Sequence, residues 1–160
     1  MKASRIFLSL ALGLAMTSCA PVSKVVTLRS DARFLGGREV EAHVEAPGDW
    51  YQATKRSDRA DLAAPDNFSS MSLSLAPVLG DPASCPDLVR RAASEAAIAV
   101  SKKVKPEFVT SPGDPNVVDF QLTVPGSPPG PSDRFVQGRV MCRNGAMAVI
   151  TCTTGVHRRG

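Results

Sequence analysis

Apolar and polar residues alternate along much of the chain after residue 37, which is the pattern of strands that bury one face. From Arg38 to Ala46, valines and alanines occupy one side, and glutamates and His43 occupy the other. The turn-forming residues Pro47-Gly48-Asp49 follow, and the segment from Trp50 to Lys55 is predicted to return beside the first strand as a hairpin. The folded part of the chain is therefore predicted to open with antiparallel strands.

The same alternation predicts three more strands in the middle of the chain. Residues 70–75 alternate between serine and a larger apolar residue and predict a third strand. Residues 56–68 before it are polar and contain Pro65, so a loop is predicted there. Residues 107–110 are predicted as a short strand, and residues 118–124 as a longer one with alternating valine, phenylalanine and leucine.

One segment changes to the helical period. Between Leu88 and Val104, apolar residues recur on one face and charged residues on the other, which predicts a helix over residues 86–105. Ser84 and Asp87 have the spacing of a capping box at its start. The apolar face consists mostly of alanine, which allows close packing on a sheet, whereas a helix lying on a membrane surface would need bulkier residues. We therefore expect a packing helix.

The last two strands are predicted by the clearest signal in the chain. The segments Arg134–Arg143 and Ala146–Thr154 flank Asn144-Gly145, a dipeptide typical of two-residue hairpin turns. That turn places Cys142 opposite Met147, and Cys152 opposite Gln137. The two cysteines then lie on opposite faces of the hairpin, so a disulfide between them is not expected.

These elements indicate an α+β domain, in which an antiparallel sheet of about six strands carries one main helix. The order of elements, the Pro-Gly-x-Trp turn at residues 47–50 and the Thr/Cys-rich last strand at residues 151–154 resemble the Mog1/PsbP-like fold. The resemblance covers residues 38–155, which we assign to a single domain. It implies no catalytic residues, because such domains are usually non-enzymatic.

The first residues of the chain have the organisation of a secretory signal. Lys2 and Arg5 precede an apolar run that is too short to span a bilayer. The run leads into Leu14-Ala15-Met16-Thr17-Ser18-Cys19, which resembles the lipobox of bacterial lipoproteins, although Met occupies a position where Leu is usual. The resemblance implies that residues 1–18 are a signal peptide and that Cys19 carries palmitate-type acyl chains. Residues 19–37 would then be a lipidated N-terminus and tether.

Two alternatives to this lipid anchor agree less well with the sequence. Ordinary signal cleavage after Ala20 would give a soluble exported protein, but it would leave Pro21 directly after the cut, which disfavours it. A buried N-terminal helix is disfavoured by the charges before the apolar run. Because Ala20 and not Asp follows Cys19, the resemblance points to the periplasmic face of the outer membrane in a Gram-negative host.

Three cysteines remain if Cys19 is acylated. Export to an oxidising compartment favours a disulfide, and the hairpin geometry leaves Cys85 as the partner of either Cys142 or Cys152. Metal binding is the weaker interpretation, because the chain has no Cys-x-x-Cys pair. No metal ligand and no cofactor-binding residue is therefore proposed from the sequence.

The charge of the chain gives no sign of nucleic-acid binding. The net charge of +4 falls to about +2 when Lys2 and Arg5 are removed, so basic and acidic residues nearly balance. The basic tail at residues 156–160 is expected to be solvated. The expected contacts are the membrane, through the lipid anchor, and an envelope protein partner.

No catalytic constellation stands out, so the chain is predicted not to be an enzyme. His43 is expected to face solvent beside Glu41 and Glu45, and Asp114 and Asp119 could pair for acid chemistry, although any sequence offers such pairs. The favoured function is that of a membrane-anchored envelope lipoprotein that acts as a non-catalytic binding or assembly module. The alternative is a small envelope hydrolase or transferase whose site gathers His43 with distant serine and aspartate residues.

Overall fold

The computed structural model describes residues 4–7, 23–30, 39–78, 84–110, 113–126 and 133–155. Cys19, the predicted cleavage site and the basic tail lie outside these residues. The elements are β1 (Ser4–Phe7), β2 (Ser23–Arg29), β3 (Val40–Pro47), β4 (Tyr51–Lys55), β5 (Arg59–Ala63), β6 (Ser69–Pro77), α1 (Cys85–Val100), β7 (Glu107–Thr110), β8 (Val117–Val124), β9 (Arg134–Arg143) and β10 (Ala146–Gly155).

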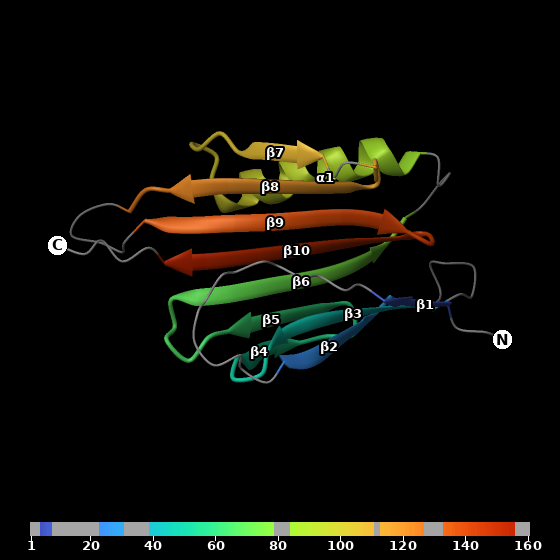
Figure 1. Cartoon of the computed structure of the whole chain (residues 1–160), viewed down its shortest axis with the longest axis horizontal. Helices are drawn as coiled ribbons and strands as arrows, with labels where there is room; N and C mark the ends of the chain where they lie inside the picture. Colours follow the sequence, from blue (N-terminus) through green and yellow to red (C-terminus); the bar gives the residue numbers. More distant parts are fainter. Residues whose placement is uncertain are drawn as a thin grey trace.

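Seven strands form one antiparallel sheet in the order β4-β5-β6-β10-β9-β8-β7. A second, three-stranded sheet has the order β1-β3-β2. Helix α1 packs on one face of the large sheet, and β2 and β3 pack on the other, so the described part of the chain has three layers (Figure 1). The α+β class is confirmed, but the strands are divided between two sheets and the larger one alone has seven.

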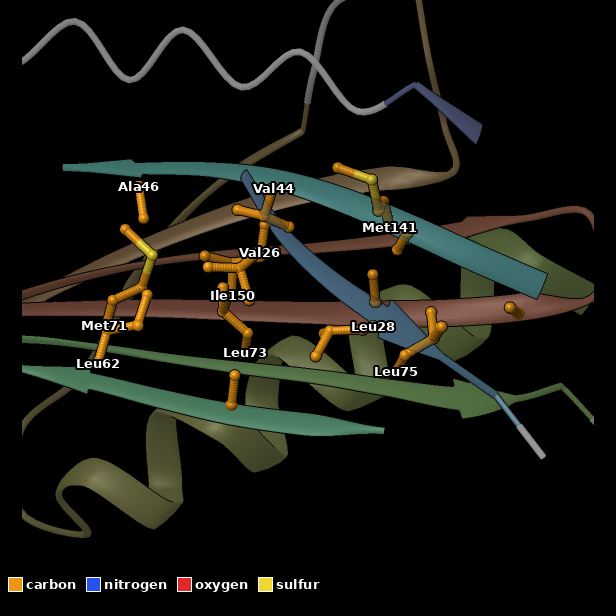
Figure 2. Close-up of a cluster of buried hydrophobic side chains, with 14 of the residues drawn as sticks. Val26, Leu28, Val44, Ala46, Leu62, Met71, Leu73, Leu75, Met141 and Ile150 are labelled. Atoms are coloured by element: carbon orange, nitrogen blue, oxygen red, sulfur yellow. The ribbon is translucent and has the colours of Figure 1, made fainter. Parts of the chain in front are cut away.

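The core on one side of the large sheet lies between the two sheets. It is built from alternate residues of β2 and β3 facing alternate residues of β5, β6 and β10, as the period of two requires, and it extends to Val117 of β8 and Met141 of β9. Figure 2 shows these side chains converging from both sheets. The labelled members are Val26, Leu28, Val44, Ala46, Leu62, Met71, Leu73, Leu75, Met141 and Ile150.

The core on the other side lies under α1. Val89, Ala93 and Ala97 are completely buried against apolar residues of β8 and β9, so the prediction of a packing helix is confirmed. The small alanine side chains allow the helix backbone to lie close to the sheet. The helix ends at Val100 and not at residue 105, because Ser101 is extended and its Oγ accepts a hydrogen bond from the Lys103 N–H.

The predicted capping box does not form. Ser84 occupies the N-cap position, but its side chain makes no cap hydrogen bond to the helix. Asp87 pairs instead with Arg90, at 3.5 Å between Oδ1 and Nη1. The start of α1 is held covalently, because Cys85 forms a disulfide with Cys142.

The segment before residue 38 contributes a strand that the sequence analysis assigned to the tether. β2 pairs antiparallel with β3 over its whole length, and its Val26 and Leu28 are 7% and 2% exposed in the core between the sheets. Val26 and Leu28 have the spacing of a strand with one buried face, but so short a pattern marks the segment only weakly. The folded domain therefore begins by Ser23.

Two further predictions in this region were wrong. The turn at Pro47 does not close a hairpin, because β3 belongs to the small sheet and β4 to the large one. Residues 59–63, predicted as loop, form β5, in which Ala60 and Leu62 are buried and Arg59 and Asp61 face outward. Only two apolar residues mark this strand, one of them alanine, so its alternation is weak in the sequence.

The strand β1 lies within the predicted signal peptide. It pairs in parallel with the first half of β3, from Ser4 opposite Val40 to Phe7 opposite His43. The buried residues that form the two described cores all follow residue 25. Removal of residues 1–18 would take β1 from the edge of the small sheet and leave these core residues in the chain.

The closing hairpin confirms its prediction. Arg143 pairs with Ala146, Cys142 with Met147 and Cys152 with Gln137. Asn144 and Gly145 have φ angles of 52° and 77°, the left-handed conformation that a two-residue turn of this type requires. The register places Cys142 in the core under α1 and Cys152 against the core between the sheets.

Candidate functional site

The face of β7, β8 and β9 opposite α1 presents two cross-strand rows of mostly polar side chains, and we call these two rows the open face. The first row consists of Val109, Asp119 and Arg139, and the second of Glu107, Gln121 and Gln137. Residues directly opposite each other on antiparallel strands point to the same side, so each row lies on one face. The open face therefore presents side-chain groups that can donate and accept hydrogen bonds.

The small sheet accounts for the position of the open face. β2 lies against β5 and β6, at the other half of the large sheet. The first row continues on β10 into Ile150, which is buried in the core between the sheets. Along that row the small sheet covers Ile150 on β10. Its neighbour on β9, Arg139, is only half-buried and is accessible to solvent.

The centre of the open face is an ion pair between Arg139 and Asp119. The Arg139 Nε and Nη2 donate to the two carboxylate oxygens of Asp119 at 2.6 and 2.8 Å. The two side chains are 31% and 33% exposed, and the hydrogen bond to Asp119 raises the pKa of Arg139 above its ordinary value. The bidentate geometry fixes both side chains, so the surface is ordered before any partner arrives.

The second row is also connected by side-chain bonding. Gln121 Nε2 donates to Glu107 Oε2 at 2.7 Å, which links β8 to the edge strand β7. Gln137 lies between Gln121 and Cys152 in the register. Desolvation raises the pKa of the Cys152 thiol from 9.0 to about 11, so at neutral pH it is not a thiolate nucleophile.

The two aspartates that could have paired for acid chemistry do not meet. Asp119 binds Arg139, whereas Asp114 accepts a hydrogen bond from Arg143 Nη2 at 2.5 Å. That bond lowers the pKa of Asp114 below its ordinary value. The lowered pKa keeps Asp114 ionised, which does not suit a general acid, and the two carboxylates are bound to different arginines.

His43 lies on the outer face of the small sheet. Its Nδ1 is 3.2 Å from Thr27 Oγ1, and its Nε2 is 3.6 Å from Glu41 Oε1. The neighbouring glutamate is one of the two expected from the sequence. The open face is on β7, β8 and β9, so these contacts belong to a different sheet.

A disulfide joins Cys85 to Cys142, with 5.7 Å between their Cα atoms. The sequence left Cys142 and Cys152 as alternative partners, and the structure has the first. The bond ties the first residue of α1 to the end of β9, across the core under the helix. Cys152 is the free cysteine among the described residues.

Trp50 and Tyr51 lie where the chain crosses from the small sheet to the large one. Trp50 packs against the core between the sheets, and its carbonyl oxygen accepts a hydrogen bond from Lys24 Nζ. Tyr51 is 51% exposed, and its hydroxyl donates to Asn67 Oδ1 at 3.1 Å. These residues are remote from the open face, at the opposite edge of the sheet.

The described residues hold neither a metal cluster nor a membrane-spanning helix. No group of three or more His, Cys, Asp or Glu side chains is placed to hold a metal ion within the residues that the structure describes. Over the same part of the chain, no helix has the length and hydropathy needed to cross a bilayer.

Comparison with known proteins gives a fold but no family. No protein-family model matches the chain, and neither does any curated protein. The crystal structure of the Saccharomyces cerevisiae Ran-binding protein Mog1p covers 85% of this chain and 79% of its own, at 8% identity and a TM-score of 0.52. A mutant form of Mog1 covers 86% and 79%, at 11% identity and a TM-score of 0.55.

The chain has the Mog1/PsbP-like fold. The fold expected from the sequence is therefore confirmed by the Mog1 structures. The cyanobacterial PsbP of Synechocystis is also similar, with 12% identity, 88% and 86% coverage and a TM-score of 0.41. At their low identities the two Mog1 structures establish the architecture alone.

The open face was not predicted from the sequence, because it depends on which strands are neighbours. Asp119 was noticed only as a possible acid, and Arg139 only as part of a hairpin. The alternation of residues 118–124 already placed Asp119 and Gln121 on the side opposite Phe120, which was the available signal. The pairing of β8 with β9 could not be derived, because a long connection separates them.

Proposed function

We propose that this chain is a lipid-anchored protein of the bacterial cell envelope that acts as a non-catalytic binding or assembly module. The observation that carries the anchor is Cys19, which follows a charged start and a short apolar run and precedes the first core strand by four residues. Each buried CH2 group contributes about 0.8 kcal/mol, and stable anchoring needs more than one acyl chain. A multiply acylated Cys19 meets that condition.

The open face is the proposed partner surface. It is mostly polar and is ordered by the bidentate pair of Arg139 with Asp119, and arginine is enriched in protein interfaces. Mog1p of Saccharomyces cerevisiae, which shares the fold, is a Ran-binding protein, so the fold can serve binding. The partner proposed for this chain is an envelope protein, and no nucleic acid is involved.

Incorporation of a clickable fatty-acid analogue tests the anchor. The full chain, expressed in a bacterium that processes lipoproteins, should be labelled and recovered with membranes. The matched variant Cys19→Ser should be unlabelled, because serine has no thiol to alkylate. Equal labelling of the two proteins would rule out Cys19 as the anchor.

Crosslinking in intact envelopes tests the partner surface. The double variant Asp119→Ala/Arg139→Ala removes both members of the pair and leaves no unpaired charge behind. The pair of Arg91 with Glu95, on the solvent side of α1, provides the matched control variant Arg91→Ala/Glu95→Ala. We expect crosslinked partners to be lost with the first double variant and retained with the second. If both proteins keep the same partners, the open face is not the binding surface.

A further inference from the structure

Exposed aromatic side chains gather at the end of the domain where β2 begins. The structure describes six large apolar or aromatic residues as exposed, among them Tyr51 and Phe68, at 51% and 55%. Tyr51 is paired with Ala63, and Phe68 follows the turn after β5, so both lie at the same end of the large sheet. Two exposed aromatic rings at one end of a small domain make that end a candidate contact surface.

The start of β2 lies at this same end. Ser23 pairs with Pro47, and Lys24 Nζ donates to the carbonyl oxygen of Trp50, the residue before Tyr51. In Figure 1 the beginnings of β2, β4 and β6 and the end of β10 all lie at the left of the molecule. Tyr51 and Phe68 therefore lie at the same end of the domain as Ser23, from which the chain continues toward Cys19.

Phe68 is held in its exposed position by backbone bonds on both sides. Its N–H donates to Asp66 Oδ1 at 2.8 Å, and its carbonyl oxygen accepts a bond of 2.9 Å from Gly155 N–H. Asn67, with a φ of 57°, turns the chain before it and accepts the Tyr51 hydroxyl bond. The backbone of the turn is thus already ordered, so contact through the exposed ring of Phe68 would cost little further backbone entropy.

The covalent distance from Cys19 to Ser23 is short. Four residue steps span at most about 14 Å when fully extended. The seven-stranded sheet, by contrast, is about 29 Å across from β4 to β7, at about 4.8 Å for each of its six spacings. A domain anchored through Cys19 must therefore keep the start of β2 close to the bilayer, while its β7 edge can stay far from it.

We infer that the end of the domain carrying Tyr51 and Phe68 rests on the lipid bilayer surface. This inference rests on the proposed acylation of Cys19. The tyrosine ring, with its one polar group, favours the interface between headgroups and acyl chains, which is the depth that a short tether brings within reach. The phenyl ring of Phe68 adds apolar surface that can be buried there. The contact fixes the orientation of the domain, so that the open face is presented in a constant direction to a partner.

Among the described residues, the charges at this end are of both signs. Lys24 and Arg134 lie here together with Asp49, Asp66 and Asp133, so these residues alone do not favour anionic lipid over neutral lipid. Each basic residue near an anionic surface contributes only about 1 kcal/mol of binding free energy, and salt screens this attraction. The contact is expected to form on neutral phosphatidylcholine and to persist at high salt.

Trp50, the only tryptophan of the chain, provides the measurement. The acylated full-length product is purified from membranes and placed in phosphatidylcholine vesicles that contain headgroup-labelled spin lipid. We expect quenching of Trp50 fluorescence, at least a twofold reduction of that quenching in Tyr51→Ser/Phe68→Ser, and no change in the control Ile98→Ser/Phe108→Ser. The control removes two residues of similar exposure, 52% and 46%, on α1 and on the edge strand β7.

Several results would overturn the inference. If the protein is acylated and floats with the vesicles but Trp50 is not quenched, the domain does not rest on this end. The same holds if the control reduces quenching as much as Tyr51→Ser/Phe68→Ser, or if high salt abolishes it. A purified product without acyl chains would refute the anchor itself, a separate failure that mass spectrometry identifies before any quenching is measured.

Discussion

Phe120 and Gly138 are direct cross-strand partners, and the ring of Phe120 occupies the space that a side chain at Gly138 would need. Both residues are buried under α1. The glycine is required here by the close approach of the ring. Gly138 has no side chain of its own, so the ring of Phe120 fills the space beside it in the core.

We expect Gly138→Ala to destabilise the protein by about 1–3 kcal/mol, because the added methyl group forces Phe120 out of its place. Urea unfolding of the two proteins measures the difference. Gly155→Ala is the matched control, since an added Cβ there would meet Phe68 only at 3.4 Å, in ordinary contact. Equal stability of Gly138→Ala and the unmodified protein would contradict the close packing of Phe120 on Gly138.

The disulfide between Cys85 and Cys142 should be a major source of stability. It closes a loop with a sequence separation of 57, for which the chain-entropy model gives about 4 kcal/mol. The double variant Cys85→Ala/Cys142→Ala should therefore unfold at much lower urea concentration.

Reducing agent provides the internal check on that prediction. It should lower the stability of the unmodified protein toward that of the double variant, and leave the double variant unchanged. Cys152→Ala should respond to reductant as the unmodified protein does. A double variant as stable as the unmodified protein would show that the bond contributes nothing.

The thiol of Cys152 should react slowly in the folded state. Burial raises its pKa from 9.0 to about 11, so the thiolate fraction near pH 8 falls to about one in a thousand. Alkylation by iodoacetamide should be at least tenfold slower in the native protein than in urea. Rapid labelling of Cys152 under native conditions would indicate an accessible, reactive thiol.

The raised pKa of Cys152 also makes the free energy of unfolding depend on pH. Because the folded state holds the Cys152 proton more tightly than the unfolded state, this stabilisation is complete below pH 9 and is lost as the pH rises toward 11. Unfolding free energies measured across this range should fall less steeply for Cys152→Ala than for the unmodified protein. Parallel pH profiles would contradict the raised pKa of this thiol.

The accuracy of the sequence-based predictions depended on how many large apolar residues marked each element. The strand over residues 118–124 and the closing hairpin were predicted with nearly correct bounds, because each has several bulky residues at a period of two. β5 was missed, since Ala60 and Leu62 are its only buried residues and Asp61 bonds outward to Ser72 Oγ at 2.6 Å.

Relations between distant strands were not predictable. The turn at Pro47 looks the same in sequence whether it closes a hairpin or carries the chain to another sheet. Register could be derived only across the Asn144-Gly145 turn, which has a single favoured geometry. The cross-strand pair of Asp119 with Arg139 and the assignment of Cys142 as the disulfide partner therefore needed the structure.

The mass of the intact protein purified from membranes is the decisive measurement for the lipid anchor. We predict a chain that begins at Cys19, lacks residues 1–18, and carries the added mass of a diacylglyceryl group and a further acyl chain. The added mass should map to the peptide that contains Cys19. A chain that retains Met1, or one that begins after Ala20 without any lipid, would contradict acylation at Cys19.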